Sequence, residues 1–247
     1  MSLIFALSAI LLTSLLSGVL GMGGGILLAG LLAIVLPLAS ALIIHAVAQL
    51  SANSYRAFLH RHAIQWRIVK HYLMGLLVTV GVFLLWRITV DKPVFYLSLG
   101  LIALTSQYVP QSKTLNACKP IHAILAGISV TALHLFVGVA GPLLDVFFQK
   151  TPLNRFQIIS TKATTQSIGH FVRISFYFTI YQQQWFAIEL HPIVFLAIIP
   201  IAVLGTKLGS KLLHNVNEQQ FRHYSRILLQ TLGAVFITKG ILGFASS

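Results

Sequence analysis

Long apolar segments constrain this chain more than any other feature of its sequence. A helix needs about 20 mostly apolar residues to cross a hydrocarbon core about 30 Å thick. Hydrophobic residues make up 57% of the 247 residues and charged residues only 9%, unlike a soluble domain with a wet surface. Several stretches qualify, including Leu3–Leu20, Tyr72–Trp86, Val94–Tyr108, Ile193–Leu208 and Ile227–Phe244. The sequence predicts an all-α, polytopic membrane helical bundle with about 8–10 membrane segments.

The basic excess of the chain, 17 Lys and Arg against 4 Asp and Glu, is also typical of nucleic-acid-binding proteins. Here, however, most basic residues lie in short loops between apolar segments, as the positive-inside rule predicts for cytoplasmic loops. We therefore expect a multi-pass protein of the cell (cytoplasmic) membrane and no nucleic-acid partner. The single cysteine, Cys118, excludes an intramolecular disulfide. No Cys/His cluster has the spacing of a metal site, so neither metal nor cofactor is expected.

An internal repeat is the most informative organisational feature. Sliding the chain on itself by 117 residues (138 minus 21) superimposes several identical residues without gaps. The identical pairs are Gly21 and Gly138, Gly24 and Gly141, Ala46 and Ala163, Gln49 and Gln166, and Arg56 and Arg173. The same shift places His45 on Lys162 and Asn53 on His170. Such a repeat indicates duplication of a multi-helix unit.

Loop charges predict how the two halves are oriented. The loop from His60 to His71 carries several basic residues, whereas its counterpart around Tyr181 to His191 has no Lys or Arg. Equivalent loops therefore lie on opposite sides, as they do when each repeat has an odd number of crossings, or a re-entrant hairpin plus three spans. We expect two inverted-topology repeats, at residues 1–112 and 120–247, joined by a basic linker at 113–119.

Each repeat opens with a hydrophobic hairpin that glycines interrupt. The first break, GVLGMGGGILL, is followed by only a dozen apolar residues before Pro37, so this leg forms a re-entrant or short helix. The second break, GVAGPLLD, contains Pro142, which suits the first turn of a new helix. A broken helix offers free N–H groups and a positive dipole end to an anion. Glycines also permit close helix packing, but breaks at equivalent positions of both halves favour a binding site.

A polar stripe follows each break. In the first half it consists of His45, Gln49, Asn53 and Arg56, and in the second of Lys162, Gln166, His170 and Arg173. Spacings of three and four residues place each set on one face of a helix. A Lys or Arg near the bilayer centre costs at least about 2.5 kcal/mol, so such residues usually line a cavity or have a partner. Because acids are few, a mobile anion is a natural partner.

The stripes also permit structural interpretations. Lys162 is close enough to its helix start to snorkel to the interface, and Gln49 and Gln166 are candidates for interhelical hydrogen bonds. Arg56 and Arg173 lie near the opposite ends of their predicted helices, which favours an interfacial position for both.

Three further residues have two readings each. His45 and His170 are candidate proton carriers, because an imidazole titrates near neutral pH, and a neutral, hydrogen-bonded histidine is the alternative. Asp145, directly after the second break, either pairs with Lys162 or takes part in proton coupling.

The chain resembles the sulfite exporter TauE/SafE family, formerly called DUF81. The resemblance rests on GVLGMGGGILL, FVGVAGPLL and STKATTQSIGHFVRI and covers nearly the whole chain. It implies a secondary transporter for sulfur-containing anions such as sulfite, thiosulfate or organosulfonates. The residues that carry over are Gly21, Gly23, Gly24, Gly25, Gly138, Gly141, Thr161, Lys162 and Ala163. One departure is Ala29-Gly30, where the family often has a proline.

We therefore expect a carrier, acting as an exporter, that alternates access around a midplane site between the repeats. The predicted substrate-binding residues are Gly23, Gly24, Gly25, His45, Gln49, Asn53, Gly138, Gly141, Lys162, Gln166 and His170, with Asp145, His45 and His170 as proton-coupling candidates. The expected partners are a small inorganic or organosulfur anion, the lipid bilayer and, as one assembly, a homodimer. A passive anion channel and a proton-coupled uptake carrier are the alternatives. An enzyme is not expected, because Ser129 and His134 lack the spacing of a catalytic set.

Overall fold

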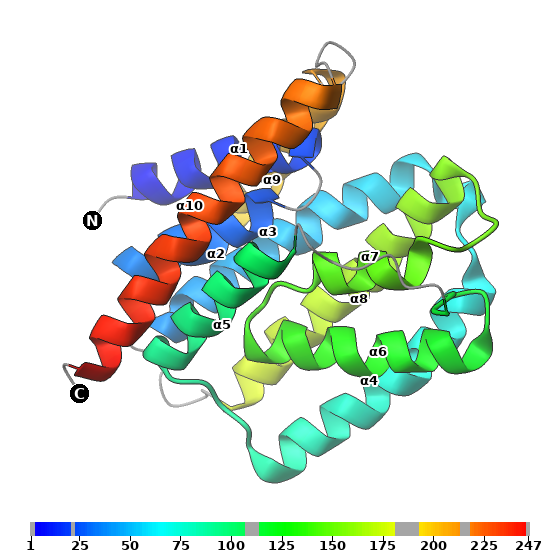
Figure 1. Cartoon of the computed structure of the whole chain (residues 1–247), viewed down its shortest axis with the longest axis horizontal. Coiled ribbons are helices and arrows are strands. Elements are labelled where there is room, and N and C mark those ends of the chain that lie inside the picture. Colours follow the sequence, from blue (N-terminus) through cyan, green and yellow to red (C-terminus); the bar gives the residue numbers. More distant parts are fainter. Residues whose placement is uncertain (1–2, 21–22, 107–113, 181–192, 213–217, 246–247) are drawn as a thin grey trace.

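The computed structural model describes residues 3–20, 23–106, 114–180, 193–212 and 218–245 (Figure 1). Its described residues form ten α-helices and one short 3-10 helix, η1 (Arg61–Ala63), and contain no strand. In the first half the helices are α1 (Leu3–Leu20), α2 (Gly23–Val35), α3 (Leu38–Leu59), α4 (Trp66–Trp86) and α5 (Lys92–Thr105). In the second they are α6 (Pro120–Phe136), α7 (Gly141–Phe148), α8 (Arg155–Ile180), α9 (Ile193–Leu212) and α10 (Glu218–Ala245). The all-α prediction is confirmed.

Three helices are long and apolar enough to cross a membrane by length and composition alone. They are α4, α9 over Phe195–Leu212 and α10 over Arg226–Ala245. The central helices α3 and α8 have the length for a crossing, with 22 and 26 residues, but carry the polar stripes. Most of the stripe residues, His45, Gln49, Asn53, His170 and Arg173, are buried in the bundle.

The helices of the two halves follow one another in the same order. The starts of α1 and α6 differ by 117 residues (120 minus 3), as do those of α3 and α8 (155 minus 38). The starts of α4 and α9 differ by 127 (193 minus 66) and those of α5 and α10 by 126 (218 minus 92). The gapless repeat therefore extends over the first three helices, and the second half has about ten more residues before its fourth helix. Five helices per half support the proposed inverted repeats.

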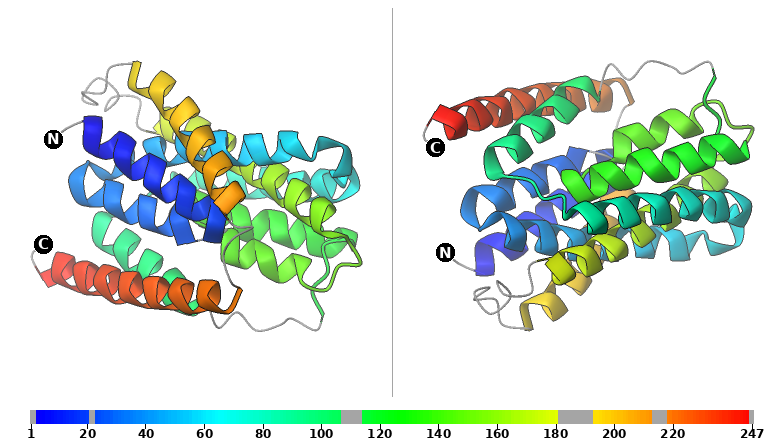
Figure 2. Two further views of the ribbon diagram at one scale, coloured as in Figure 1. Left: turned by 90° about the horizontal axis from the view of Figure 1, so that it is seen from above. Right: turned by 90° about the horizontal axis from the view of Figure 1, so that it is seen from below.

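Packing between the halves has the same symmetry. The pairs α3–α8 and α5–α10 each join equivalent helices, while α1 packs on α9 as α6 packs on α4. Exchanging the halves leaves this set of contacts unchanged. Figure 2 shows α5 and α10 side by side along one edge of the bundle. The helices α3 and α8 run antiparallel, because Leu42 and His45 contact Arg173 whereas Ser54 contacts Ser167.

The second leg of each opening hairpin is short. At 1.5 Å per residue, the 13 residues of α2 and the 8 residues of α7 span about 20 and 12 Å, less than the hydrocarbon core of about 30 Å. Pro142 lies in the first turn of α7, as predicted. Gly24 brings α2 against the Thr13 carbonyl and Ser17 of α1, so the first hairpin folds back on itself.

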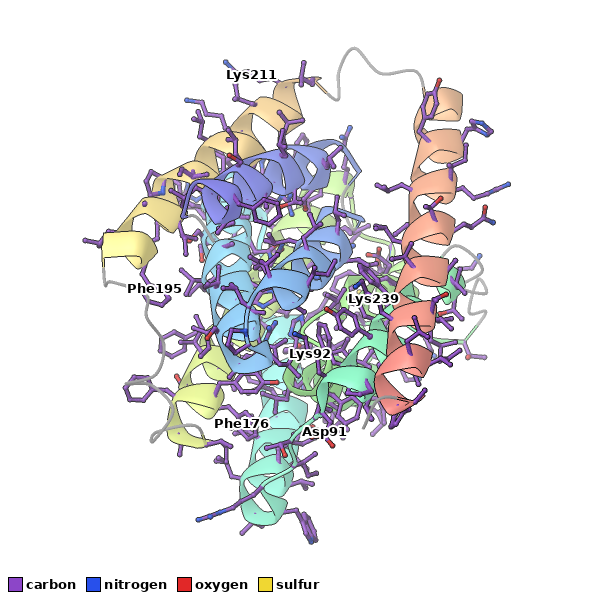
Figure 3. All side chains as sticks on the ribbon, turned by 90° about the vertical axis from the view of Figure 1, so that its left-hand side faces the viewer. Asp91, Lys92, Phe176, Phe195, Lys211 and Lys239 are labelled. Atoms are coloured by element: carbon purple, nitrogen blue, oxygen red, sulfur yellow. The ribbon has the colours of Figure 1, made fainter. Side chains whose placement is uncertain are left out.

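Two basic segments, the loop after α3 and the linker, meet at one end of the α3–α8 pair, which we call the basic end. Gln65, before α4, donates its backbone N–H to Thr161 Oγ1 (2.9 Å), so the loop after α3 lies on the start of α8. The described linker residues 114–119 reach the same place, because Ala117 N–H donates to the Phe147 carbonyl (2.8 Å). Lys211, at the end of α9, lies far from Asp91 and Lys92 (Figure 3). The loop Tyr181–His191, whose charge was compared with that of the loop from His60 to His71, lies outside the described residues.

Large apolar side chains cover the outside of α4 and α10. Examples on α4 are Met74, Leu77, Val78, Leu85 and Trp86, and on α10 Val235, Ile241, Leu242 and Phe244. In water such surfaces would be interaction sites or liabilities, but hydrocarbon solvates them. Inside the bundle, small residues let helices approach closely, as in other membrane proteins. Gly75 of α4 lies against the Ile124 carbonyl of α6, and Gly127 of α6 lies against the Tyr72 carbonyl of α4.

We predict that Gly75→Ala destabilises the protein. An added methyl group would collide with the backbone carbonyl of Ile124, which cannot move without displacing α6, and overpacking of this kind costs about 1–3 kcal/mol. Thermal unfolding in detergent should show a lower Tm. The matched control is Gly81→Ala in the same helix, where an added Cβ meets nothing within 4 Å. An equal Tm for the two variants would contradict the close α4–α6 contact.

Candidate functional site

The polar stripes of α3 and α8 face each other in the middle of the bundle. Gln49 lies midway along α3 (38–59) and Gln166 midway along α8 (155–180). An arginine follows each glutamine after seven residues. Because the two helices are antiparallel, these two arginines lie on opposite sides of the centre. Arg56 lies about 10 Å toward the basic end and Arg173 about 10 Å toward the opposite end, at 1.5 Å per residue.

Arg173 is the centre of a fully buried cluster near the opposite end, which we call the Arg173 cluster (His45, His134, His170 and Arg173). Its side chain is 0% exposed. One guanidinium nitrogen donates to the Gly138 carbonyl (3.0 Å) and to His45 Nδ1 (3.1 Å), and the other donates to the Leu42 carbonyl (2.5 Å). The side chain therefore joins α8 to α3 and to the glycine break between α6 and α7.

Glycine is required at the break because of this arrangement. Gly138 has a φ of +84°, a conformation that residues with a Cβ rarely adopt. A Cβ at this position would also collide with the Arg173 guanidinium. The carbonyl of Gly138 points at Arg173 instead of continuing a helix, so the break supplies an acceptor to a buried cation.

The bonds around His45 fix its protonation. A guanidinium only donates, so His45 Nδ1 must accept from Arg173, and the ring proton must be on Nε2. Nε2 lies 3.0 Å from the Gly25 carbonyl, to which it donates. His45 is therefore neutral in this conformation, with both nitrogens engaged. Protonation of Nδ1 would break the bond to Arg173.

Two further histidines complete the Arg173 cluster. The rings of His134 on α6 and His170 on α8 lie 4.6 Å apart, and His170 lies 6.0 Å from His45 in an edge-on arrangement. The Nδ1 atoms of His134 and His170 are buried and have no hydrogen-bond partner in the described part of the chain. Gly169 makes room for the His134 ring.

A second polar group lies toward the basic end, and we call it the Lys162 cluster (Arg56, Asp145 and Lys162). Lys162 forms an ion pair with Asp145, and the side chains are 23% and 24% exposed. Of the two readings of Asp145, the structure shows the pair. Arg56 donates to Asn53 Oδ1 (3.4 Å) and Ser17 Oγ (3.2 Å), and its charge repels that of Lys162. No carboxylate of the described residues contacts Arg56.

Between the clusters lie the two glutamines. Gln49 is only 8% exposed, and its amide nitrogen packs against Gly25 in the first turn of α2. Neither Gln49 nor Gln166 makes a side-chain hydrogen bond to the part of the chain that the structure describes. Interhelical hydrogen bonding, the structural alternative, is therefore not observed for either amide within these residues.

The structure brings most of the predicted site residues to the α3–α8 contact. Gly25, His45, Gln49 and Asn53 lie on one side of it, and Gly138, Lys162, Gln166 and His170 on the other. Gly23, Gly24 and Gly141 lie at the starts of α2 and α7, and Gly24 has a packing role. Gly21 lies outside the described residues.

The predicted position of Arg173 at the membrane–water interface is wrong. Because α8 continues to Ile180, seven residues beyond Arg173, this residue lies well inside the bundle. The sequence feature that singled out Arg173 was its identity with Arg56 at the equivalent position of the repeat. His134 was also not predicted as part of the site, since it comes from α6, outside both stripes. Thr161, by contrast, has a structural role, because its hydroxyl accepts the Gln65 N–H.

Comparison with known proteins identifies the family of this chain. The model of the sulfite exporter TauE/SafE family matches residues 6–236, which leave out only the first three residues of α1 and the last nine of α10 among the described helices. The chain belongs to the sulfite exporter TauE/SafE family. Members of the TauE/SafE family are membrane transporters of sulfite or related anions, not enzymes, and this chain is accordingly a multi-pass membrane protein. No curated protein and no solved structure is similar enough to count as a match.

We predict that Arg173→Lys destabilises this TauE/SafE protein. A lysine keeps the charge but cannot reach the Gly138 and Leu42 carbonyls and His45 together, so buried acceptors lose their donor at about 1–3 kcal/mol each. A lower Tm in detergent is expected. The control Arg155→Lys, exposed at the start of the same helix, should leave the Tm unchanged. If the two variants have the same Tm, Arg173 does not join the repeats.

Proposed function

We propose that this protein is an alternating-access carrier for small sulfur oxyanions, which bind between Gln49 and Gln166 at the centre of the α3–α8 pair. The observation that carries the proposal is the pair of repeat-equivalent glutamine amides without partners in the described chain, midway along the two central helices. An amide without a partner in an apolar bundle costs free energy. A bound oxyanion would accept its N–H groups.

The chemistry around the glutamines suits reversible anion binding. The first turn of α2 begins at Gly23, so its free N–H groups and positive dipole end lie beside Gln49. Arg56, Lys162 and Arg173 lie about 6–10 Å along the helices from the glutamines, close enough to raise the local potential. Neutral donors nearest the anion and cations farther away favour binding without trapping the ion.

The two clusters support a carrier more than a channel. The side chains of the Arg173 cluster are buried, whereas Lys162 and Asp145 of the Lys162 cluster are partly exposed. A carrier has one side closed at any time, while an open channel has neither. Taking the basic end as cytoplasmic by the positive-inside rule, we propose that this conformation is the inward-facing one.

Export is the direction that needs no coupled ion. An inside-negative potential favours outward movement of an anion by about 2.3 kcal/mol per charge per 100 mV. The proton-coupling candidates are engaged in this conformation, since both nitrogens of His45 are bonded and Asp145 is paired with Lys162. His170 keeps an unpartnered Nδ1 within the described structure and is the remaining candidate for proton-coupled uptake.

The decisive experiment is saturable flux of labelled sulfite, thiosulfate or a sulfonate in liposomes containing the purified protein. We predict that Gln49→Ala and Gln166→Ala each raise the half-saturating concentration about tenfold or more, because a hydrogen bond to a charged group contributes about 1.5–3 kcal/mol. The control Ser129→Ala removes an exposed hydroxyl that bonds only within α6 and should leave transport unchanged.

Absence of saturable flux for every sulfur oxyanion tested would overturn the proposed function. Currents without counterflow would favour a passive anion channel. Flux that persists unaltered in both glutamine variants would remove the central site while leaving the carrier in place.

A further inference from the structure

The repeats place equivalent residues on the two sides of the central site, but their chemistry differs. The buried contact between Arg173 and His45 has an equivalent in the other half, since Arg173 corresponds to Arg56 and His45 corresponds to Lys162. On one side a cation meets a neutral acceptor. On the other side two cations meet.

This difference decides how each side closes. Neutral His45 accepts a hydrogen bond from Arg173, so that contact forms without any further ion. An ammonium group has no acceptor, so Lys162 cannot accept a hydrogen bond from Arg56. Bringing these two cations as close as Arg173 and His45 would instead raise their mutual repulsion, most of all where water is excluded. The side of the Lys162 cluster therefore cannot close by the contact that closes the other side.

The charges of the Lys162 cluster leave one positive charge to be matched. Asp145 pairs with Lys162, while the hydrogen-bond partners of Arg56, the Asn53 amide and the Ser17 hydroxyl, are neutral. Asp145 has no acidic equivalent in the first half, where Leu28 stands (145 minus 117). Two cations and one carboxylate leave a net charge of +1, divided between two cationic side chains that cannot bond to each other, and one monoanion between them would neutralise it. The fork of a guanidinium and the ammonium both suit the oxygens of a sulfur oxyanion.

We propose that Arg56 and Lys162 form a gate at the basic end that closes only around a monoanionic sulfur oxyanion, whose oxygens bridge the two cations. The inference rests on the proposed function, because it assigns residues that bind the same substrate on its way to the central site. Substrate binding and closure of this side are then one event.

The gate gives the empty carrier a preferred state. Without an anion the side of the Arg173 cluster closes and the side of the Lys162 cluster stays open, so the empty protein rests facing the basic end. An anion at the opposite end meets a carrier whose binding-competent state is rarely populated, which weakens its apparent affinity. The half-saturating concentration is therefore lower at the basic end than at the opposite end.

The test uses a single reporter cysteine in full-length protein in proteoliposomes. Cys118→Ser removes the only cysteine of the chain, and Ser54→Cys introduces one on α3, at an exposed position between Gln49 and Arg56. A membrane-impermeant maleimide is applied at the basic end, and the rate at which it labels this cysteine is measured. The anion is methanesulfonate, a monoanionic sulfonate that does not react with maleimide, and flux of the same anion is measured in the same preparation.

We expect methanesulfonate to slow labelling about tenfold, within the usual range of couplings between sites. The variant Lys162→His gives the gate a histidine, the residue that stands at the equivalent position 45 of the other side. In this variant, labelling should already be slow without anion, and adding methanesulfonate should change its rate less than about twofold. Unchanged labelling in a reporter protein that transports methanesulfonate would overturn the gate. Lys162→His labelling like its parent would overturn it as well. Absence of saturable flux in the parent protein would instead contradict the proposed function.

A second variant keeps the test decisive if Lys162→His fails to fold. Asp145→Asn leaves two unmatched cations, so the gate should then require two negative charges. The protection given by sulfate relative to methanesulfonate should rise about tenfold. An unchanged ratio would overturn the charge balance on which the gate depends. The control Asp91→Asn, near the far end of α4, should leave the ratio as in the parent.

Discussion

The structure depends on a buried cation that holds three elements together. Arg173 has no exposure and contacts no carboxylate of the described residues, so its charge is balanced by carbonyl oxygens and a neutral imidazole. Those acceptors come from α3 and from the break after α6. An arginine in this position is costly unless every acceptor is in place. The antiparallel α3–α8 contact, the left-handed Gly138 and the tautomer of His45 together supply acceptors to its two terminal nitrogens, while its Nε has no partner among the described residues.

The duplication in the sequence accounts for the position of the proposed site. Inverted repeats related by an axis in the membrane plane place equivalent residues at mid-depth, and the repeat-equivalent Gln49 and Gln166 lie midway along α3 and α8. Equivalent positions on either side of the axis then hold Arg173 with His45 and Arg56 with Lys162. Divergence of one residue, histidine in one half and lysine in the other, makes the chemistry of the two sides different in a nearly symmetric structure.

Much of the architecture was predictable from local sequence. The spans at Leu3–Leu20 and Ile193–Leu208 lie within α1 and α9, because an apolar run of this length has few alternatives in a membrane. The polar stripes also fall on the predicted helices. The position of Arg173 was not predictable, since the sequence does not mark where α8 ends. His134 was not predicted, because the role of a histidine in an apolar helix depends on which residues of the neighbouring helix lie against it.

The sequence by itself determined an all-helical membrane protein of the TauE/SafE family, with a repeat, two glycine breaks and two polar faces, because hydropathy and periodicity are properties of single segments. Only the tertiary structure decided which polar groups satisfy one another. It paired Lys162 with Asp145, joined Arg173 to His45 and left both glutamine amides without partners in the described chain. Hydrogen bonds between residues more than a hundred positions apart depend on how helices pack, and no local pattern specifies that.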